Sequence, residues 1–396
     1  MIKICNNNEC TGCEACATVC PVQCITMTPN KDGFCYPVID KSKCIQCKRC
    51  IKTCPNNAVL KKGNASFFMG WHKNKDILLN SSSGGAFTAI ADLVLKQNGV
   101  VYGACFMEES FTVEHIEIEN ADDLGKLRLS KYFQGRTNEC YKKAEIALKE
   151  KGRQVLFTGT GCQIAGLYKY LGKEYANLLT VDILCHGVAS KKVIDAYISS
   201  KEKKYKKKVK SFRFRLKPPD SYWMHGGGTR MRLDFADGSK IIEEVGSDTF
   251  FIGFNTFLFL RESCYTCKYT GTERIADITL ADFWGIDLNS LPDEQRKNGV
   301  SLIIANSEKG KALVKELNKD MIIHPADPER AVPANQALSK PGTANENRTE
   351  FFKMLDSYDF DTLVQKFNRT LYLKLKIRKI LGNRLCNLIK SIVGRT

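Results

Sequence analysis

Residues 10–21 read CTGCEACATVCP and residues 44–55 read CIQCKRCIKTCP, so the chain carries the pattern C-x-x-C-x-x-C-x-x-x-C-P twice. Such spacing sets three thiolates on one tight loop and a fourth at the start of a short helix, as in bacterial proteins that hold 4Fe-4S clusters. The fourth thiolate of each run reaches the cluster of the other run. The runs therefore predict two clusters, the first held by Cys10, Cys13, Cys16 and Cys54, and the second by Cys44, Cys47, Cys50 and Cys20.

Zinc and disulfides are the competing interpretations of these cysteines. Paired C-x-x-C motifs also build zinc ribbons, but zinc takes four ligands per site and has no use for ligands crossed between two runs. Disulfides need an oxidising compartment, and the N-terminus MIKICNNNECTGC has no feature of a signal peptide. We therefore expect a two-cluster ferredoxin domain over residues 1–62, in the reducing cytoplasm of an anaerobic cell.

Length and charge set the remaining bounds. A chain of 396 residues is too long for a ferredoxin alone, so a further domain with its own core must follow. No apolar run approaches the roughly 18 to 20 residues that span a bilayer. The net charge of +17 favours binding to an acidic partner, a phosphate-rich ligand or an anionic surface. The densest basic block, Lys201–Lys210, is either a solvated helix end or a docking place for an acidic electron carrier such as ferredoxin; no nucleic-acid-binding signature accompanies it.

After a turn-rich linker at Lys61–Ser66, strand-like and helix-like segments alternate, which predicts an α/β catalytic domain with a parallel or mixed sheet. The predicted strands are Val100–Phe106, Val155–Thr158, Leu178–Leu184, Val209–Leu216, Ile275–Leu280 and Val300–Ala305, and the predicted helices are Ala86–Lys96, Tyr141–Glu150, Gln163–Leu171 and Lys192–Lys201. Asp237-Gly238 between Thr229–Phe235 and Lys240–Val245 predicts a hairpin. The predicted domains are 1–62, 63–325, a helical extension over 326–370, and a basic amphipathic helix over 371–396.

Four more cysteines stand in loops beside glycine, histidine or aromatic residues. They are Cys162 in GTGCQIAGL, Cys185 in ILCHG, and Cys264 and Cys267 in SCYTCKYTG. Their number and type suit a third 4Fe-4S cluster, and the alternative is that they are small apolar residues buried in a core. The latter interpretation also covers the remaining cysteines, Cys5, Cys24, Cys35, Cys105, Cys140 and Cys386.

A glycine-serine loop, Ser81–Gly85, opens the predicted helix Ala86–Lys96. A serine there can cap the helix, or the glycines can let the backbone approach a diphosphate at the helix N-terminus. A second strand-loop-helix turn, Phe157–Cys162, can serve the same ligand or the third cluster.

Five segments together resemble the beta-subunit family of the coenzyme F-420 (deazaflavin) hydrogenases and dehydrogenases. They read SSSGGAFTAIADLVLKQNGVVYGACF, SKYFQG, LFTGTGCQIAGL, VDILCHGVAS and SCYTCKYTGTERIADITLADFWG. The resemblance implies an α/β domain that binds FAD and a 4Fe-4S cluster, with Cys162, Cys185, Cys264 and Cys267 as the ligands of that cluster. It places Ser82, Ser83, Gly84 and Gly85 on the FAD diphosphate, and Lys131 and Tyr132 near the flavin. The family commonly has proline at the position of Gly161.

Clusters pass single electrons and a flavin exchanges one or two. The resemblance therefore implies an oxidoreductase that couples a one-electron carrier to a two-electron organic substrate, of the F-420 type or another. The alternatives are a relay subunit without its own substrate and a redox sensor without turnover. Asp277 and Asp282–Gly285 either shape the pocket or pack a strand end. The basic tail either lies on an anionic membrane surface at the inner face or packs on protein.

Overall fold

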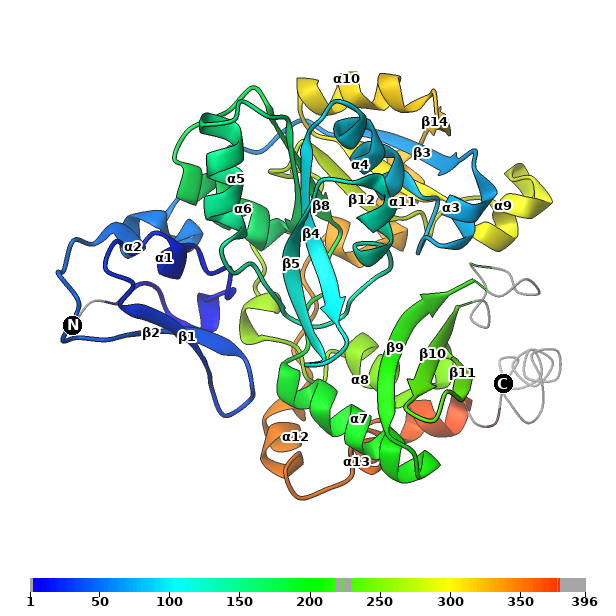
Figure 1. The fold of residues 1–396 in the computed structure, drawn as a ribbon. Coiled ribbons are helices and arrows are strands. Elements are labelled where there is room, and N and C mark those ends of the chain that lie inside the picture. The colour runs from blue at the N-terminus through cyan, green and yellow to red at the C-terminus, as the bar shows by residue number, and fades with distance from the viewer. Residues whose placement is uncertain (1–2, 218–222, 224–228, 376, 378–396) are drawn as a thin grey trace.

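The computed structural model describes residues 3–217, 223, 229–375 and 377 (Figure 1). It consists of a small N-terminal module and a larger mixed α/β domain, so the predicted fold class is confirmed. The basic tail predicted over 371–396 lies mostly outside the described residues. In the part of the chain that is described, no helix is long and apolar enough to cross a membrane.

The N-terminal module has two similar halves, as its repeated sequence predicts. The antiparallel strands β1 (Ile25–Pro29) and β2 (Cys35–Ile39) pair with each other. The short helices α1 (Ala15–Thr18) and α2 (Arg49–Thr53) each follow a residue in the left-handed conformation, Glu14 or Lys48. These two turns fold each cysteine run back on itself, because a left-handed residue reverses the chain direction between the second and third cysteines. Single-turn helices at Asn7–Glu9 and Pro55–Asn57 complete the module.

The large sheet, within the described residues, has nine strands in the order β14-β3-β13-β12-β8-β7-β4-β5-β6. Four of them, β12, β8, β7 and β4, are parallel neighbours, whereas β13 runs antiparallel between β12 and β3. The strands are β3 (Ser66–His72), β4 (Val100–Met107), β5 (Thr112–Ile118), β6 (Gly135–Arg136), β7 (Val155–Thr160), β8 (Leu178–Ile183), β12 (Ile278–Asp282), β13 (Ser301–Ala305) and β14 (Met321–Pro325). The near-continuous apolar runs of β7, β8 and β13 follow from burial of these strands on both faces.

Helices cover both faces of this sheet. On one face α4 (Ala86–Lys96) and α10 (Glu308–Leu317) share a core with β4 and β13. On the other face α5 (Cys140–Lys149) and α6 (Gly161–Leu171) pack on β4 and β7, and the N-terminal module lies against this side (Figure 1). Shorter helices are α3 (Lys75–Leu79), α9 (Asp293–Asn298) and α11 (Pro328–Ala334), with 3-10 turns at Ala121–Lys126, Val245–Ser247, Glu262–Cys264, Leu288–Ser290 and Gln336–Leu338.

A second, antiparallel sheet has the order β11-β10-β9 and stands beside the large one. Its strands are β9 (Val209–Leu216), β10 (Arg230–Phe235) and β11 (Lys240–Glu244), so the predicted hairpin is present. Its phenylalanine-rich core includes residues of α7 (Lys191–Tyr205), α8 (Thr249–Asn255), α12 (Arg348–Met354) and α13 (Phe360–Phe367).

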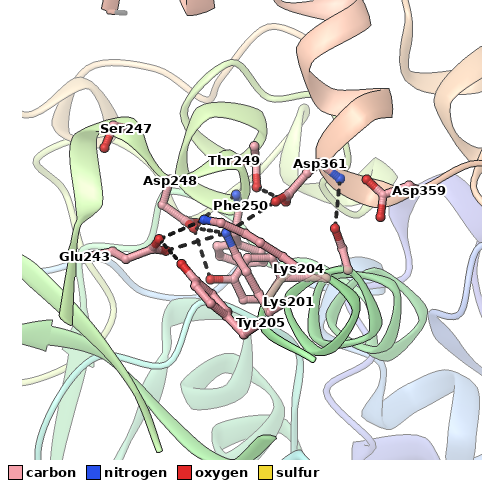
Figure 2. A network of polar contacts seen from close by, with 12 residues as sticks. Lys201, Lys204, Tyr205, Glu243, Ser247, Asp248, Thr249, Phe250, Asp359 and Asp361 are labelled. Carbon is pink, nitrogen blue, oxygen red and sulfur yellow. Dashed lines mark hydrogen bonds and ion pairs between the residues drawn. The ribbon is translucent and has the colours of Figure 1, made fainter. Parts of the chain in front are cut away.

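The basic block Lys201–Lys210 is largely the solvated helix end expected from the sequence, since all its lysines except Lys201 are exposed. Lys201 is buried, and its Nζ lies 2.9 Å from Asp248, 3.5 Å from Asp361 and 3.6 Å from Glu243 (Figure 2). Burial lowers the pKa of Lys201, but the carboxylates outweigh it and hold the pKa above its usual value. Three further lysines of the block, Lys204, Lys207 and Lys208, also form ion pairs within the chain. Lys201 therefore joins α7 to its neighbours, while the other lysines of the block stay at the surface.

Candidate cluster and cofactor sites

The first predicted cluster site is a cavity of about 330 Å³ in the N-terminal module. Its lining includes the four cysteines assigned to the first cluster, Cys10, Cys13, Cys16 and Cys54, so the fourth cysteine of the second run does reach the first loop. A hydrogen bond from Cys5 lowers the pKa of Cys10 to about 6 against the effect of burial. Burial raises the pKa of Cys13 to about 12.

The second predicted site is a cavity of nearly the same size, about 320 Å³. It is lined by Cys20, Cys44, Cys47 and Cys50, which is the crossed set expected for the second cluster. Among the described residues no three His, Cys, Asp or Glu side chains are close enough to hold one metal ion. A 4Fe-4S cluster offers each thiolate a separate iron, so the group that suits these cavities is larger than an ion.

Two cysteines that sequence reasoning assigned to an apolar core line these cavities instead. Cys5 borders the first cavity, and Cys24 borders the second with its Sγ 3.5 Å from the Sγ of Cys20. Cys105 and Cys140 are buried in the apolar clusters of the large domain, as expected, Cys35 is partly buried, and Cys386 lies outside the described residues.

Buried ionic contacts fix the N-terminal module to the large domain. The Glu14 carboxylate pairs with Arg136 and accepts hydrogen bonds from the backbone N–H groups of Thr137 (2.9 Å) and Asn138 (2.7 Å). Arg348 Nη1 lies 3.4 Å from the Asp32 carboxylate.

Arg261, 1% exposed, makes the most extensive of these contacts. It donates to the carbonyls of Cys10 (2.7 Å) and Cys35 (3.0 Å) and to the side chain of Gln134 (2.9 Å), and its guanidinium lies over the ring of Tyr36. Moving the module would leave the buried charge of Arg261 without its hydrogen-bond acceptors, which costs free energy. These contacts therefore hold the module in one position.

The third set of cysteines comes together from three segments of the large domain. Cys162 begins α6, Cys185 follows β8, and Cys264 and Cys267 come from the loop after α8. Burial raises the pKa of Cys185 well above its usual value, and negative charge on the other three cysteines raises it further, because all four face one another. Burial likewise raises the pKa of Cys264 to about 12 and of Cys267 to about 11. Such thiols ionise only when a metal replaces their protons.

The contacts of Gly161 explain why glycine stands at a position where the family that the sequence resembles commonly has proline. A Cβ at this position would lie 2.8 Å from Cβ of Tyr269 and 3.2 Å from the Asp182 carboxylate. Burial raises the pKa of Tyr269, and negative charge on Cys162, Cys13 and Cys267 raises it further. Tyr269 is therefore close both to the third set of cysteines and to the first cavity. Glycine is therefore the residue that fits beside this tyrosine.

The glycine-serine loop lies where the predicted anion site requires it, but the serines do not cap the helix. Gly85, with φ of +86°, is the N-cap of α4, and no described side chain caps this helix end. Ser83 donates to the carbonyl of Val300, and Ser82 accepts a hydrogen bond from Ser130 (3.0 Å). The loop therefore meets the SKYFQG segment. The N–H of Thr88 donates to the carbonyl of Gly85, whereas those of Ala86 and Phe87 have no hydrogen-bond partner among the described residues and are open to an anion.

Gly84 and Lys131 have structural partners in the chain. A Cβ on Gly84 would lie 2.2 Å from the carbonyl of Gly70, so this glycine is needed where the loop crosses β3. Lys131 Nζ donates to the carbonyls of Leu127 and Arg128, and burial lowers its pKa to about 8. Both residues can still lie near a bound cofactor, but contacts within the chain are sufficient to explain why glycine and lysine occur at these positions.

Two cations that sequence reasoning missed gather at the same loop. Arg215 donates to the Tyr132 hydroxyl (3.1 Å), the Asp282 carboxylate (3.0 Å) and the carbonyl of Ser82. Arg215 Nε and Asp282 Oδ1 are buried and find no hydrogen-bond partner among the described residues. Lys217 donates to the carbonyl of Ser83, and burial lowers its pKa to about 7 although Asp282 opposes this. Arg213, Arg215 and Lys217 alternate along β9 and the residue after it, and this alternation is the sequence pattern that could have indicated cations on one face.

Two tryptophans border the same region. Trp223 stacks on Trp284 with their ring centroids 5.0 Å apart, and Trp284 is partly exposed. Trp223 Nε1 also donates to the carbonyl of Ser82. Cations, open backbone N–H groups and a flat aromatic surface together suit a dinucleotide with a diphosphate and an extended ring.

All these groups meet at one edge of the large sheet. Strands β3, β7, β8 and β12 run in the same direction, because β3 and β12 are both antiparallel to β13. Their carboxyl ends lead to the serine loop, Cys162, Cys185 and Asp282 respectively. Ligands of open α/β sheets bind at the carboxyl ends of the strands, and the third cysteine set and the Arg215 region both lie at these ends.

Three family models match parts of the chain. Residues 9–58 and residues 36–92 match two models of 4Fe-4S dicluster domains. Residues 152–331 match the model of the family described as the C terminus of the coenzyme F420 hydrogenase/dehydrogenase beta subunit. The N-terminal module is therefore an iron-sulfur electron-transfer domain joined to an α/β domain of the oxidoreductase class. The resemblance to this family is confirmed, and three of the five segments that suggested it lie within the matched residues.

Among solved structures, the chain is similar to one of the F420-reducing [NiFe] hydrogenase complex from Methanosarcina barkeri. The two are 15% identical, with a TM-score of 0.45, and the match covers 82% of this chain and 95% of that one. No curated protein matches the chain.

Proposed function

We propose that this chain is an iron-sulfur flavoprotein oxidoreductase. It passes electrons between a one-electron carrier such as ferredoxin and a two-electron organic substrate, of the F420 type or another. The cofactors are two 4Fe-4S clusters in the N-terminal module, a third at Cys162, Cys185, Cys264 and Cys267, and FAD. Bound flavin supplies the exchange between single electrons and electron pairs.

The observation that carries the proposal is the contact between the first cavity and α6. A Cβ on Gly166 would lie 3.2 Å from the Sγ of Cys13, so this ligand loop rests directly on the helix. Cys162 stands in the first turn of the same helix, four residues or about 6 Å along its axis from Gly166. The N-terminal cysteines and the third set are therefore neighbours across one helical turn.

The Arg215 region supports FAD as the organic cofactor. Ser82, the open N–H groups of α4, Arg215 and Lys217 would hold the diphosphate, and Tyr132 and Trp284 would border the ring. Arg215 balances Asp282 in this region, so Lys217 is the cation whose charge responds to an anion. The substrate would then enter from the exposed side of Trp284, and the protein would act in the cytoplasm.

Anaerobic purification with iron, sulfide and flavin quantification tests the proposal. We expect about 12 iron atoms and one FAD for each chain, as three 4Fe-4S clusters require, and flavin reduction by reduced methyl viologen. Cys162→Ser should lower the iron content by about one cluster and slow flavin reduction, whereas the matched variant Cys140→Ser should change neither. Colourless reconstituted protein without iron or flavin would refute the function.

A further inference from the structure

The two cluster cavities differ in what surrounds them. The first is covered by the large domain, through Cys13 on α6 and Arg261 on the carbonyl of Cys10. The second has an exposed rim, because Cys47, Lys48 and Arg49 are exposed residues of its lining. The second cavity therefore offers more exposed lining residues to an electron carrier from solution than the first.

The rim of the second cavity is strongly basic. Between Tyr36 and Lys62 the only acidic residue is Asp40, whereas the basic residues are Lys41, Lys43, Lys48, Arg49, Lys52, Lys61 and Lys62. Lys43 pairs with Asp40 and Lys62 with Glu273. Lys41, Lys48, Arg49 and Lys52 are exposed and form no ion pair with any residue that the structure describes. Lys41, Lys48 and Lys52 therefore present their charge to solvent, whereas Arg49 also acts on Glu145 of α5, whose pKa it helps to lower.

Apolar side chains stand among these cations. Ile45 is 61% exposed, Val38 is 54% exposed and Val22 is 36% exposed, and both Ile45 and Val22 line the second cavity. Protein interfaces commonly combine a small apolar centre with a charged rim, and opposite charge on the partner speeds the encounter and sets its orientation. We call the surface formed by Val22, Ile45, Cys47, Lys48 and Arg49 the Cys47 face.

We propose that the Cys47 face is the docking surface for an acidic one-electron carrier of the ferredoxin type. The proposal rests on the proposed function and adds the place of electron entry and the charge of the partner. At this face one electron leaves the reduced carrier and enters this chain, and no covalent bond forms or breaks. Charge complementarity favours an acidic protein, and the adjacent cavity of four cysteines favours one that carries single electrons.

Charge reversal on the Cys47 face tests the docking surface. We compare Lys48→Glu/Arg49→Glu with the control Lys203→Glu/Lys210→Glu, whose two lysines are exposed in the other basic block. Both double variants change the net charge by the same amount, so they separate local contact from the overall field. The probe is an oxidised acidic bacterial two-cluster ferredoxin, whose binding to the holoprotein is measured anaerobically by calorimetry at low and high salt.

We expect the Kd of the Cys47-face variant to rise about tenfold or more at low salt, and the difference to shrink at high salt. The control should change by less than about threefold. An unchanged Kd in the Cys47-face variant, or an equal loss in both, would overturn the proposal, as would binding of the face to anionic phospholipid vesicles but not to ferredoxin. Lys48→Gln/Arg49→Gln repeats the test if charge reversal lowers the iron content.

The outcome is separable from that of the proposed function. Reduction of the flavin by methyl viologen needs no docking, so we measure it on the wild type and on the control variant. If methyl viologen reduces the flavin while ferredoxin binding ignores the Cys47 face, the docking surface alone is wrong. If ferredoxin binding depends on the face but no flavin is present, the proposed function is wrong and the docking surface stands.

Discussion

Replacing Arg261 with methionine should loosen the N-terminal module from the large domain. The guanidinium donates three hydrogen bonds that join Cys10 and Cys35 of the module to Gln134 and the large domain. Methionine retains much of the apolar stem but leaves three buried acceptors without donors. Each such acceptor costs about 1 to 3 kcal/mol, and removal of the buried cation offsets part of the sum. The bonds to Cys10 and Cys35 cross the boundary, and because hydrogen bonds from a charged donor contribute about 1.5 to 3 kcal/mol each, we expect a net cost of about 4 kcal/mol.

Hydrogen exchange at the module boundary measures this loss. The amides of Thr137 and Asn138 donate to Glu14 of the module, so they exchange when the module separates. A cost of about 4 kcal/mol raises the opening equilibrium by about three powers of ten, and their exchange should quicken accordingly. The control Arg230→Met removes a more exposed ion pair with Glu244 and should change exchange by less than about tenfold. Exchange at Thr137 and Asn138 that stays within tenfold of wild type in Arg261→Met would refute the reasoning.

Four further outcomes are expected. Cys47→Ser should weaken electron transfer from ferredoxin while FAD content stays the same; equal loss of FAD contradicts the modular arrangement. Burial lowers the pKa of His115 to about 4 in the folded protein. As pH falls, this histidine is therefore protonated first in the unfolded chain. The free energy of unfolding should decrease between about pH 6.5 and pH 4, by about 3 kcal/mol in all. Urea midpoints at pH 7 and pH 5 should therefore differ less in His115→Gln than in wild type. The pKa of Lys217 is lowered to about 7, so its side chain is charged at pH 6 and mostly neutral at pH 8. FAD affinity, measured by equilibrium dialysis, should therefore fall from pH 6 to pH 8. In Lys217→Gln the affinity should be the same at both pH values. Gly161→Ala should cost about 1 to 3 kcal/mol against Tyr269, with the uncrowded Gly125→Ala as control in urea unfolding; equal midpoints contradict it.

Local pattern was enough to predict much of the fold. The helix Ala86–Lys96 begins and ends at the predicted residues, and the Asp237-Gly238 hairpin is present with Gly238 in the left-handed conformation. The crossed cysteine sets also line the two cavities as expected from spacing alone. These features succeed because each depends on residues close together in the sequence or on a spacing that one cofactor imposes.

Features that depend on long-range contact were missed. The burial of Lys201 depends on Asp248 and Asp361, which are 47 and 160 residues away in the sequence and which no pattern connects to α7. Arg215 lies in β9 of the smaller sheet and Lys217 follows that strand, and only the tertiary fold brings them to the serine loop. For Cys5 and Cys24 no repeat signal was available, because the corresponding positions of the other half are Ile39 and Ala58.

The clamp formed by Glu14, Arg261 and Arg348 has a consequence for how electrons enter the large domain. A domain on a free tether must search for its acceptor in every cycle, and its delivery rate then varies with tether length and solvent viscosity. Here the loop of Cys13 already rests on the helix that begins beside Cys162. The segment from Lys61 to Ser66 is thus a covalent connection and not a swinging arm, so lengthening it should leave internal transfer unchanged.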